Sequence, residues 1–238
     1  MTALHERVAR GLGDVRRRIA VAGADPSRVT VVAVTKGFGV EAVEAALTAG
    51  LVDVGESYAQ ELVTKSSALG RTDVRWHFVG RLQSNKVKAL AGVVDRWQSV
   101  DRPSLVEELA RRASGARVLV QVNVSGEPRK GGCPPAETSA LVSQLVRSGL
   151  RVDGLMAVGA WGPPEQARPG FRLLSGLADA LDLPERSMGM SGDLEVALEE
   201  GATMIRVGQA LFGPRPTRGA DPAPSRSSGM APSRCDTK

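Results

Sequence analysis

Short apolar runs alternate with helix-like segments along most of the chain, and this alternation restricts the fold more than any other feature. The runs of strand character occupy residues 29–35, 51–54, 75–79, 97–100, 117–123, 152–158, 186–190 and 203–207. Between them lie segments with apolar residues three or four positions apart, such as 40–47, 105–110, 141–146 and 171–181. Eight such repeats in 238 residues predict a single (β/α)8 TIM barrel, an α/β fold. A doubly wound open sheet is the alternative.

The two ends of the chain differ from this repeat. An amphipathic helix precedes the first strand, with an apolar stripe formed by Leu4, Val8, Leu12, Val15 and Ile19. The three arginines at 16–18 fall on its polar side, which favours a solvated helix face. From Pro214 onward Pro, Ser, Gly and Arg predominate and little can be buried. We therefore expect a barrel domain over 1–213, including the extra N-terminal helix, and a disordered tail over 214–238.

Composition narrows the class of protein. The chain has no apolar run of 18 residues and no signal-peptide pattern at its start, so we expect a cytoplasmic protein outside the membrane. Two cysteines, Cys133 and Cys235, and two histidines provide neither a disulfide framework nor a metal-binding spacing, so we expect no metal. The net charge of +5 is compatible with nucleic acid, but the aromatic residues needed for base stacking are few. A small anionic ligand is the alternative that we favour.

Lys36 ends the first apolar run, which reads Val-Thr-Val-Val-Ala-Val-Thr-Lys from residue 29. A continuous apolar run is typical of a parallel strand covered on both faces, so a lysine at its end is out of keeping with the strand. Burial or a neighbouring cation lowers the pKa of a lysine and makes its amine nucleophilic toward an aldehyde. An ordinary lysine paired with a carboxylate at the rim of the barrel is the alternative, and the strand alone does not separate the two.

Two glycine-containing turns follow the last two strands. Ser191 and Gly192 come after the seventh strand and open a helix, and Gly208 follows the eighth strand in the same way. Such turns present free backbone N–H groups to an anion, although serine at a helix start is more often an ordinary N-cap. The ends of strands seven and eight are also where TIM barrels commonly bind phosphate. The coincidence favours a phosphate site.

Arg206 lies in the eighth strand near its end, beside the first strand if the barrel closes. It either forms an ion pair at the rim or faces a ligand held between Lys36 and the two turns. If that ligand contains a pyridine nitrogen, the guanidinium must donate to it, and the nitrogen stays unprotonated. An unprotonated pyridine is a weak electron sink, so the arrangement would support formation and exchange of a Schiff base better than carbanion chemistry.

Several blocks of the sequence resemble the signature of one known family, the pyridoxal-phosphate homeostasis proteins (the YggS/PROSC family). The blocks are residues 32–36 (VAVTK), 55–61 (GESYAQE), 76–86 (WHFVGRLQSNK), 187–193 (SMGMSGD) and 206–208 (RVG). The resemblance runs from about residue 4 to residue 213. It implies a fold-type III barrel similar to the N-terminal domain of alanine racemase.

The resemblance also implies a cofactor and its contacts. Pyridoxal 5′-phosphate (PLP) would form a Schiff base with Lys36, its phosphate would contact Ser191, Gly192 and Gly208, and Arg206 would lie near the pyridine nitrogen.

Four further positions carry weaker expectations. Ser57 stands where the family usually has asparagine, which implies a shortened contact near the cofactor ring. His77, Asn85 and Met190 are candidate secondary contacts, although His77 also fits a hydrogen-bonded interior histidine. Lys86, next to Asn85, is either a ligand for a second anion or a solvated residue.

Three functions remain open at this point. The first is a monomeric PLP carrier that is not an enzyme, limits free PLP and supplies it to PLP-dependent apo-enzymes. The second is a slow amino-acid racemase in which Lys36 is one base and Tyr58, His77 or a cysteine is the other. The third is a phosphate-binding barrel without PLP, in which Lys36 binds an anion by charge alone.

Overall fold

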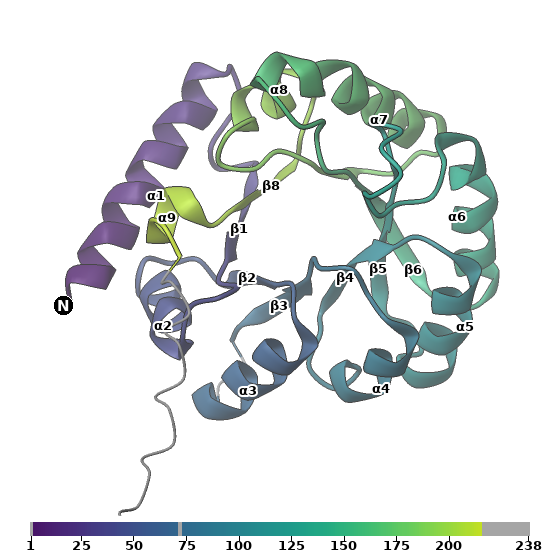
Figure 1. Cartoon of the computed structure of the whole chain (residues 1–238), viewed down its shortest axis with the longest axis horizontal. Helices are drawn as coiled ribbons and strands as arrows, with labels where there is room; N and C mark the ends of the chain where they lie inside the picture. The colour runs from purple at the N-terminus through teal and green to yellow at the C-terminus, as the bar shows by residue number, and fades with distance from the viewer. Residues whose placement is uncertain (1, 71–72, 216–238) are drawn as a thin grey trace, which may run out of the picture.

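The computed structural model describes residues 2–70 and 73–215, and they form a closed parallel barrel surrounded by helices (Figure 1). Each strand pairs with the next in chain order, and the first pairs with the last. The strands are β1 (Thr30–Val34), β2 (Asp53–Glu56), β3 (Arg75–Phe78), β4 (Arg96–Val100), β5 (Arg117–Gln121), β6 (Arg151–Met156), β7 (Glu185–Ser187) and β8 (Met204–Val207). The predicted (β/α)8 TIM barrel is confirmed, and the open-sheet alternative is wrong.

Helices cover the outside of the barrel, in the order that the apolar periodicity predicts. The α-helices are α1 (Ala3–Val21), α2 (Val40–Thr48), α3 (Ala59–Leu69), α4 (Val87–Leu90), α5 (Pro103–Arg112), α6 (Thr138–Arg147), α7 (Arg168–Ala180), α8 (Leu194–Glu199) and α9 (Gln209–Phe212). Short 3₁₀ helices precede three of them: η1 (Ser84–Lys86), η2 (Pro135–Glu137) and η3 (Pro164–Ala167).

Every strand differs from its predicted range by one to three residues at an end, and the differences at β2 and β7 are explained by local structure. The second run was expected at 51–54, but β2 begins two residues later, because the apolar residues at 51 and 52 precede the pairing of Asp53 with Arg75. The seventh run was expected at 186–190, but β7 ends at Ser187. Gly189 has a φ of +91°, a left-handed conformation that a strand cannot continue through. The segment after Ser187 therefore belongs to the mouth of the barrel.

The interior of the barrel differs from the layer between sheet and helices. The outer layer is a large apolar core, whereas the inside holds a small apolar cluster of Val32, Val34, Leu119, Met156 and Met204. Beside this cluster lie four buried polar side chains, His77, Gln98, Ser187 and Arg206. Buried polar groups are tolerated when they are hydrogen-bonded, so this interior must form a connected network.

The N-terminal helix packs against the end of the barrel domain. Val8, Leu12, Val15 and Ile19 of α1 are buried, as the apolar stripe predicts. Gly11 lies against α9, and a Cβ at this position would come within 2.4 Å of the carbonyl oxygen of Ala210. Glycine therefore lets α1 approach α9 closely, next to the last strand.

Two sequence predictions concern the chain beyond this core. Within the described ranges, no helix is long and apolar enough to cross a membrane. Of the predicted tail, residues 216–238 lie outside the described residues, whereas Pro214 and Arg215 are described and lie at the mouth of the barrel.

Candidate functional site

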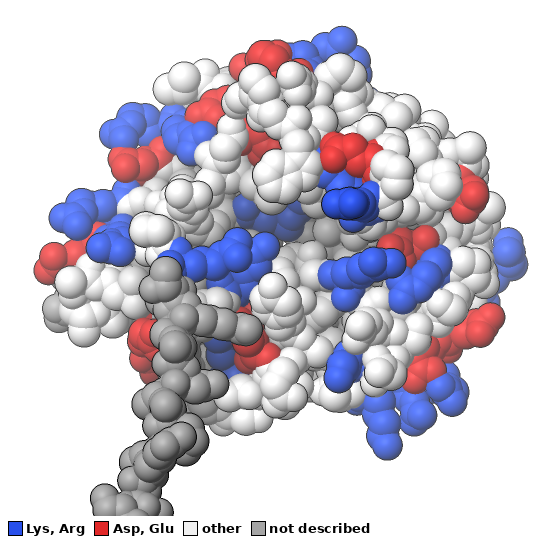
Figure 2. Space-filling model, viewed as in Figure 1, with Lys and Arg blue, Asp and Glu red and all other residues white. Residues whose placement is uncertain are grey.

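A cavity of about 810 Å³ opens at the end of the barrel where the strands finish. Its lining comes from the segments after β1, β2, β3, β6, β7 and β8 and from the chain that follows α9. Figure 2 shows basic side chains around the hollow at the centre of this face. Sites in this fold gather at this end, because the loops after the strands converge there.

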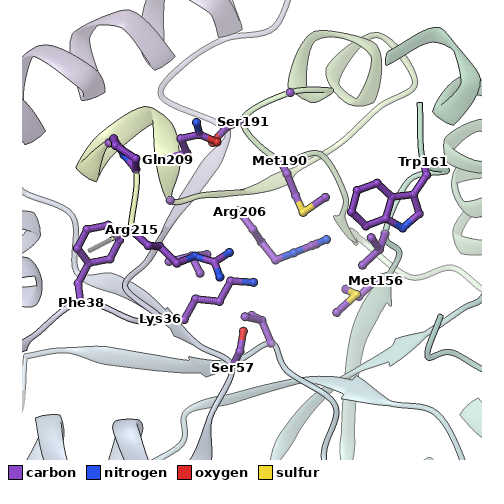
Figure 3. A pocket seen from close by; sticks show the side chains of 17 residues that line it. Lys36, Phe38, Ser57, Met156, Trp161, Met190, Ser191, Arg206, Gln209 and Arg215 are labelled. Carbon is purple, nitrogen blue, oxygen red and sulfur yellow. The ribbon is translucent and has the colours of Figure 1, made fainter. Parts of the chain in front are cut away.

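Lys36 is the second residue after β1, and its side chain points into the cavity (Figure 3). Its side chain is half-buried, and within the described ranges its amine has no hydrogen-bond or ion-pair partner. Burial lowers the pKa of this amine, and the positive charges of Arg215 and Arg206 lower it further, against an opposing effect of Glu56. A larger share of the amine is therefore unprotonated and nucleophilic than in an ordinary lysine.

A buried ion pair fixes the backbone on either side of Lys36. Lys65 of α3 donates to the carbonyl oxygen of Thr35 at 2.8 Å and to Glu56 Oε1 at 2.5 Å. The backbone N–H of Gly37 donates to Glu61 Oε2 at 2.8 Å, and Glu61 also lies 3.5 Å from Lys65. Lys65 therefore pairs with the carboxylates of Glu56 and Glu61, and the amine of Lys36 is left free toward the cavity.

The charged groups that line the described part of the cavity are all cationic: Lys36, Arg206 and Arg215. Figure 3 shows their side chains converging on the same space. Because no described carboxylate lines the cavity to balance these charges, a bound anion would be attracted strongly.

The turn after β7 supplies a hydroxyl. Ser191 Oγ accepts a hydrogen bond from the backbone N–H of Ala210 at 3.2 Å, so its own proton is available to a ligand. Arg18 of α1 donates to the carbonyl oxygen of Ser191 with both Nη atoms, at 3.0 Å each, and forms an ion pair with Glu195. The interpretation of residues 16–18 as a solvated face is therefore wrong for Arg18, which holds this turn in place.

Gly208 forms the second turn, between β8 and α9. A Cβ at this position would lie 3.0 Å from the carbonyl oxygen of Val34, so a side chain would press against the end of β1. Gly208, Gln209 and Gly192 line the cavity beside Ser191. The first N–H groups of a helix have no partner within the helix, so this part of the wall offers backbone donors.

Arg206 lies at the base of the cavity and is almost fully buried. Nη1 donates to the carbonyl oxygen and to Oγ of Ser187, and Nη2 donates to the carbonyl oxygen of Ala157, all at 2.7 Å. Burial lowers the pKa of this guanidinium to about 10, so it keeps its charge at neutral pH. The sequence allowed Arg206 either an ion pair at the rim or a place facing a ligand. Its described partners are a hydroxyl and two carbonyl oxygens, so the ion pair is excluded among the described residues.

The other expected positions divide into two groups. Ser57 and Met190 line the cavity. His77 does not: it lies inside the barrel, bonded to Asp53 at 2.9 Å and to Gln98 at 2.6 Å. Asn85 and Lys86 are exposed and are not part of the cavity wall. The expected secondary contacts of His77 and Asn85 are therefore absent from this cavity.

Several lining residues had no role in the sequence analysis. Arg215 was assigned to the tail, yet its side chain lies over Gly37, and a Cβ there would be 3.2 Å from Arg215 Cδ. Trp161, 83% exposed, stands at the rim, and Phe38 packs on Phe212 with ring centroids 5.4 Å apart. Only the positive charge of Arg215, eight residues after the end of β8, could have drawn attention to any of these positions in the sequence.

The arrangement suits one kind of ligand. A nucleophilic amine, a hydroxyl with backbone donors and two guanidinium groups surround one space. The backbone and hydroxyl donors suit phosphate oxygens, and the free amine suits an aldehyde. A small molecule carrying both groups therefore fits the residues present.

Comparison with known proteins supports the same kind of ligand. The family model described as the N-terminal domain of alanine racemase matches residues 13–216. The pyridoxal phosphate homeostasis protein of Aquifex aeolicus is 39% identical over 222 residues, which cover 88% of this chain and 97% of the relative. The protein of the same name from Pseudomonas aeruginosa is 40% identical over 223 residues, covering 90% and 97%.

A solved structure adds a ligand to the comparison. PipY of Synechococcus elongatus, solved with PLP bound, superposes with a TM-score of 0.75 at 32% identity. The match covers 87% of this chain and all of PipY.

Proposed function

Because this chain belongs to the pyridoxal phosphate homeostasis proteins, we propose that it binds PLP in the cavity at the mouth of its barrel, holds it on Lys36 and regulates its supply. The observation that carries the proposal is the unpaired amine of Lys36, which shares a cavity with two guanidinium groups and no described carboxylate.

The residues present fit PLP in their chemistry. The amine of Lys36 would form a C=N bond with the aldehyde carbon of PLP, with loss of one water. We assign the phosphate to the Ser191 hydroxyl and the backbone around Gly192 and Gly208. Ser57 lies near the cofactor ring in this proposal. Arg206, which remains charged, donates to the pyridine nitrogen.

Arg215 has a supporting role in this proposal. Its charge adds to that of Arg206 in lowering the pKa of Lys36, and it attracts the anionic form of the ligand. An arginine at this place therefore favours both capture of a phosphorylated aldehyde and the nucleophilic form of the amine.

The cavity argues for a carrier against a racemase. A racemase needs a second acid or base on the face of the substrate opposite the lysine. Tyr58 is 54% exposed, and neither it nor His77 nor Cys133 lines the cavity. Among the described residues, the cavity wall therefore holds no tyrosine, histidine, cysteine or carboxylate that could act as the second acid or base. We further propose that the protein is a cytoplasmic monomer and that it supplies PLP to apo-enzymes.

A titration tests the proposal. PLP is added to the purified protein, and the absorbance change that accompanies C=N bond formation is followed. We expect saturable binding in the wild type, no such absorbance change in Lys36→Ala, and an unchanged titration in Lys86→Ala, which removes an exposed lysine outside the cavity. A wild-type spectrum that does not change, or an undiminished change in Lys36→Ala, would refute it.

Exchange of the α-hydrogen of L-alanine tests the racemase alternative. The PLP-loaded protein is incubated with L-alanine in deuterium oxide, and incorporation is followed by mass spectrometry. We expect incorporation no faster than with free PLP. Faster incorporation that Lys36→Ala abolishes would favour the enzyme.

A further inference from the structure

A chain of hydrogen bonds crosses the interior of the barrel from Arg206 to the opposite side. Arg206 Nη1 donates to Ser187 Oγ at 2.7 Å, and Ser187 Oγ donates to Gln98 Oε1 at 2.7 Å. Gln98 Nε2 lies 2.6 Å from His77 Nδ1, and His77 Nε2 lies 2.9 Å from Asp53 Oδ1. The five residues come from β8, β7, β4, β3 and β2, so the chain connects both halves of the barrel.

The two ends of this series of hydrogen bonds fix its direction together, because the guanidinium of Arg206 only donates and the carboxylate of Asp53 only accepts. Ser187 Oγ accepts from Arg206, and because Ser187 is fully buried it gives its own proton to Gln98 Oε1. Gln98 must then present its oxygen to Ser187 and its NH₂ group to His77. His77 accepts at Nδ1, carries its proton on Nε2 and donates to Asp53. The protons all point from the cation toward the carboxylate.

Burial makes this direction costly to reverse. Ser187 and Gln98 are fully buried, and His77 is 1% exposed. Turning any one group would place two donors or two acceptors face to face without water to compensate. The chain therefore holds Arg206 in one orientation.

In this orientation, some N–H groups of Arg206 have no protein partner and are available to a ligand in the cavity. Of the five N–H groups of an arginine side chain, both on Nη1 bond Ser187, and one on Nη2 bonds Ala157. The N–H of Nε and the second N–H of Nη2 remain. Because Arg206 lines the cavity, these are the donors that a ligand can meet.

We propose that Gln98 and His77 are positioning residues for PLP: through Ser187 they fix Arg206 so that one remaining N–H donates to the pyridine nitrogen. The inference rests on the proposed function, but neither residue touches the cavity. Their effect on the ligand is carried entirely by the hydrogen-bond chain.

A pair of ligands isolates this effect. PLP and its 1-deaza analogue, in which C–H replaces the ring nitrogen, carry the same aldehyde and phosphate. The ratio of their dissociation constants is measured for each variant, so that the intrinsic difference between the two aldehydes cancels. Gln98→Met removes the acceptor of Ser187 and the donor to His77, and the preference for PLP should fall about tenfold relative to wild type, the effect of one hydrogen bond to a charged group.

Two variants serve as controls. Met204→Leu removes the sulfur that Gln98 Nε2 also contacts at 3.1 Å, without breaking the chain, and should leave the preference within about twofold of wild type. Gln98→Glu keeps an acceptor for Ser187 but replaces the NH₂ donor to His77 Nδ1 with a second acceptor, so it should restore only part of the preference lost in Gln98→Met. Thermal denaturation of each ligand-free variant shows whether it folds.

A measurement on the ligand-free protein is independent of PLP. The chain has two histidines, so nitrogen-15 NMR spectra of wild type and His5→Asn assign the ring of His77. We expect the neutral ring to carry its proton on Nε2. A proton on Nδ1 would contradict the assigned direction of the hydrogen bonds, and this test holds even if Gln98→Met fails to fold.

The outcomes separate the two proposals. If Gln98→Met weakens both ligands equally, Gln98 is merely structural and the positioning role is wrong. If the wild type forms no adduct with either aldehyde, the proposed function fails and the positioning role fails with it. A selective loss of the preference for PLP supports both.

Discussion

Lys36 and Lys65 both adjoin the end of β1, yet the structure surrounds their charges in opposite ways. Lys65 is 5% exposed and bonds Thr35 and Glu56. Lys36 is half-buried, and its amine has no partner within the described ranges. Burial lowers the pKa of Lys36 and the two arginines lower it further, while Lys65 binds the nearby carboxylate of Glu56. A reactive lysine here depends on a second lysine that is not reactive.

The same contrast separates the cavity from the barrel interior beneath it. The cavity concentrates positive charge without a described counter-charge, which suits an anionic ligand. The interior ends at Asp53, which bonds His77 and Arg75. Positive charge is left unpaired where a ligand is expected, whereas the buried charges of Lys65 and Asp53 are paired. Four substitutions test this division, in decreasing order of expected effect.

Lys65→Met should have the largest effect on stability. It leaves the carboxylate of Glu56 buried without its cation, which typically costs about 3–5 kcal/mol of unfolding free energy. Urea denaturation of the ligand-free protein measures the loss. The double variant Lys65→Met with Glu56→Leu should recover most of it, since an apolar pair needs no counter-charge. A loss below about 1 kcal/mol for the single variant would contradict a structural role.

Asp53→Asn should have an intermediate effect that depends on pH. Burial raises the pKa of Asp53, but hydrogen bonds and charge from His77 and Arg75 outweigh it and lower the pKa from 3.8 to about 2. Because the folded pKa is depressed, the stabilisation is present above pH 3.8 and is lost as pH falls through about 2.

At neutral pH this stabilisation amounts to about 2 kcal/mol. Urea denaturation of wild type and Asp53→Asn at neutral pH and at a pH of about 2 measures this stabilisation. A difference of the same size at both pH values would show that the charge of Asp53 is not its source.

Lys36→Met should change the unfolding free energy by less than about 1 kcal/mol, in favour of the variant. The folded state disfavours the charged amine, so the unfolded chain binds more protons from the lowered pKa up to the ordinary value of 10.5. Wild-type stability should therefore rise with pH relative to Lys36→Met across that window. Denaturation at neutral and alkaline pH checks this, and marked destabilisation at neutral pH would indicate a hidden ion pair.

Arg215→Gln should have the smallest effect. Burial is the larger cause of the lowered pKa of Lys36, so removing one positive charge should raise the pH midpoint of adduct formation only slightly. The pH dependence of adduct formation with 5-deoxypyridoxal, which lacks the phosphate, isolates this effect. Arg16→Gln removes an equal charge from an exposed position on α1 and should leave the profile unchanged. A profile for Arg215→Gln that matches wild type would exclude Arg215 from the cavity's electrostatics.

The sequence predicted the barrel because strand and helix periodicities alternate regularly, and it placed Lys36, Ser191, Gly208 and Arg206 together because parallel strands end on one side. It did not predict the partners of Lys65, since an ion pair between α3 and β2 depends on how the helix is rotated against the sheet. Arg215 was missed for a related reason: a chain after the last helix can take any path, and composition alone favoured a tail.

The sequence also did not predict where β7 ends or which way the side chain of His77 points. Gly189 ends β7 early because of its backbone conformation, which residue type permits but does not require. His77 was expected either inside or near a ligand, and the alternation of side chains along β3 decides this only once the register with β2 and β4 is known.

The central claim is that the amine of Lys36, and not that of Lys65 or of an exposed lysine, reacts with PLP. The protein is mixed with one equivalent of PLP and reduced with borohydride, which converts a C=N bond into a stable amine. Peptide mass spectrometry then locates the added mass. The account predicts that it lies on the peptide containing Lys36. A modification found mainly on other lysines, or no stable adduct at all, would contradict it.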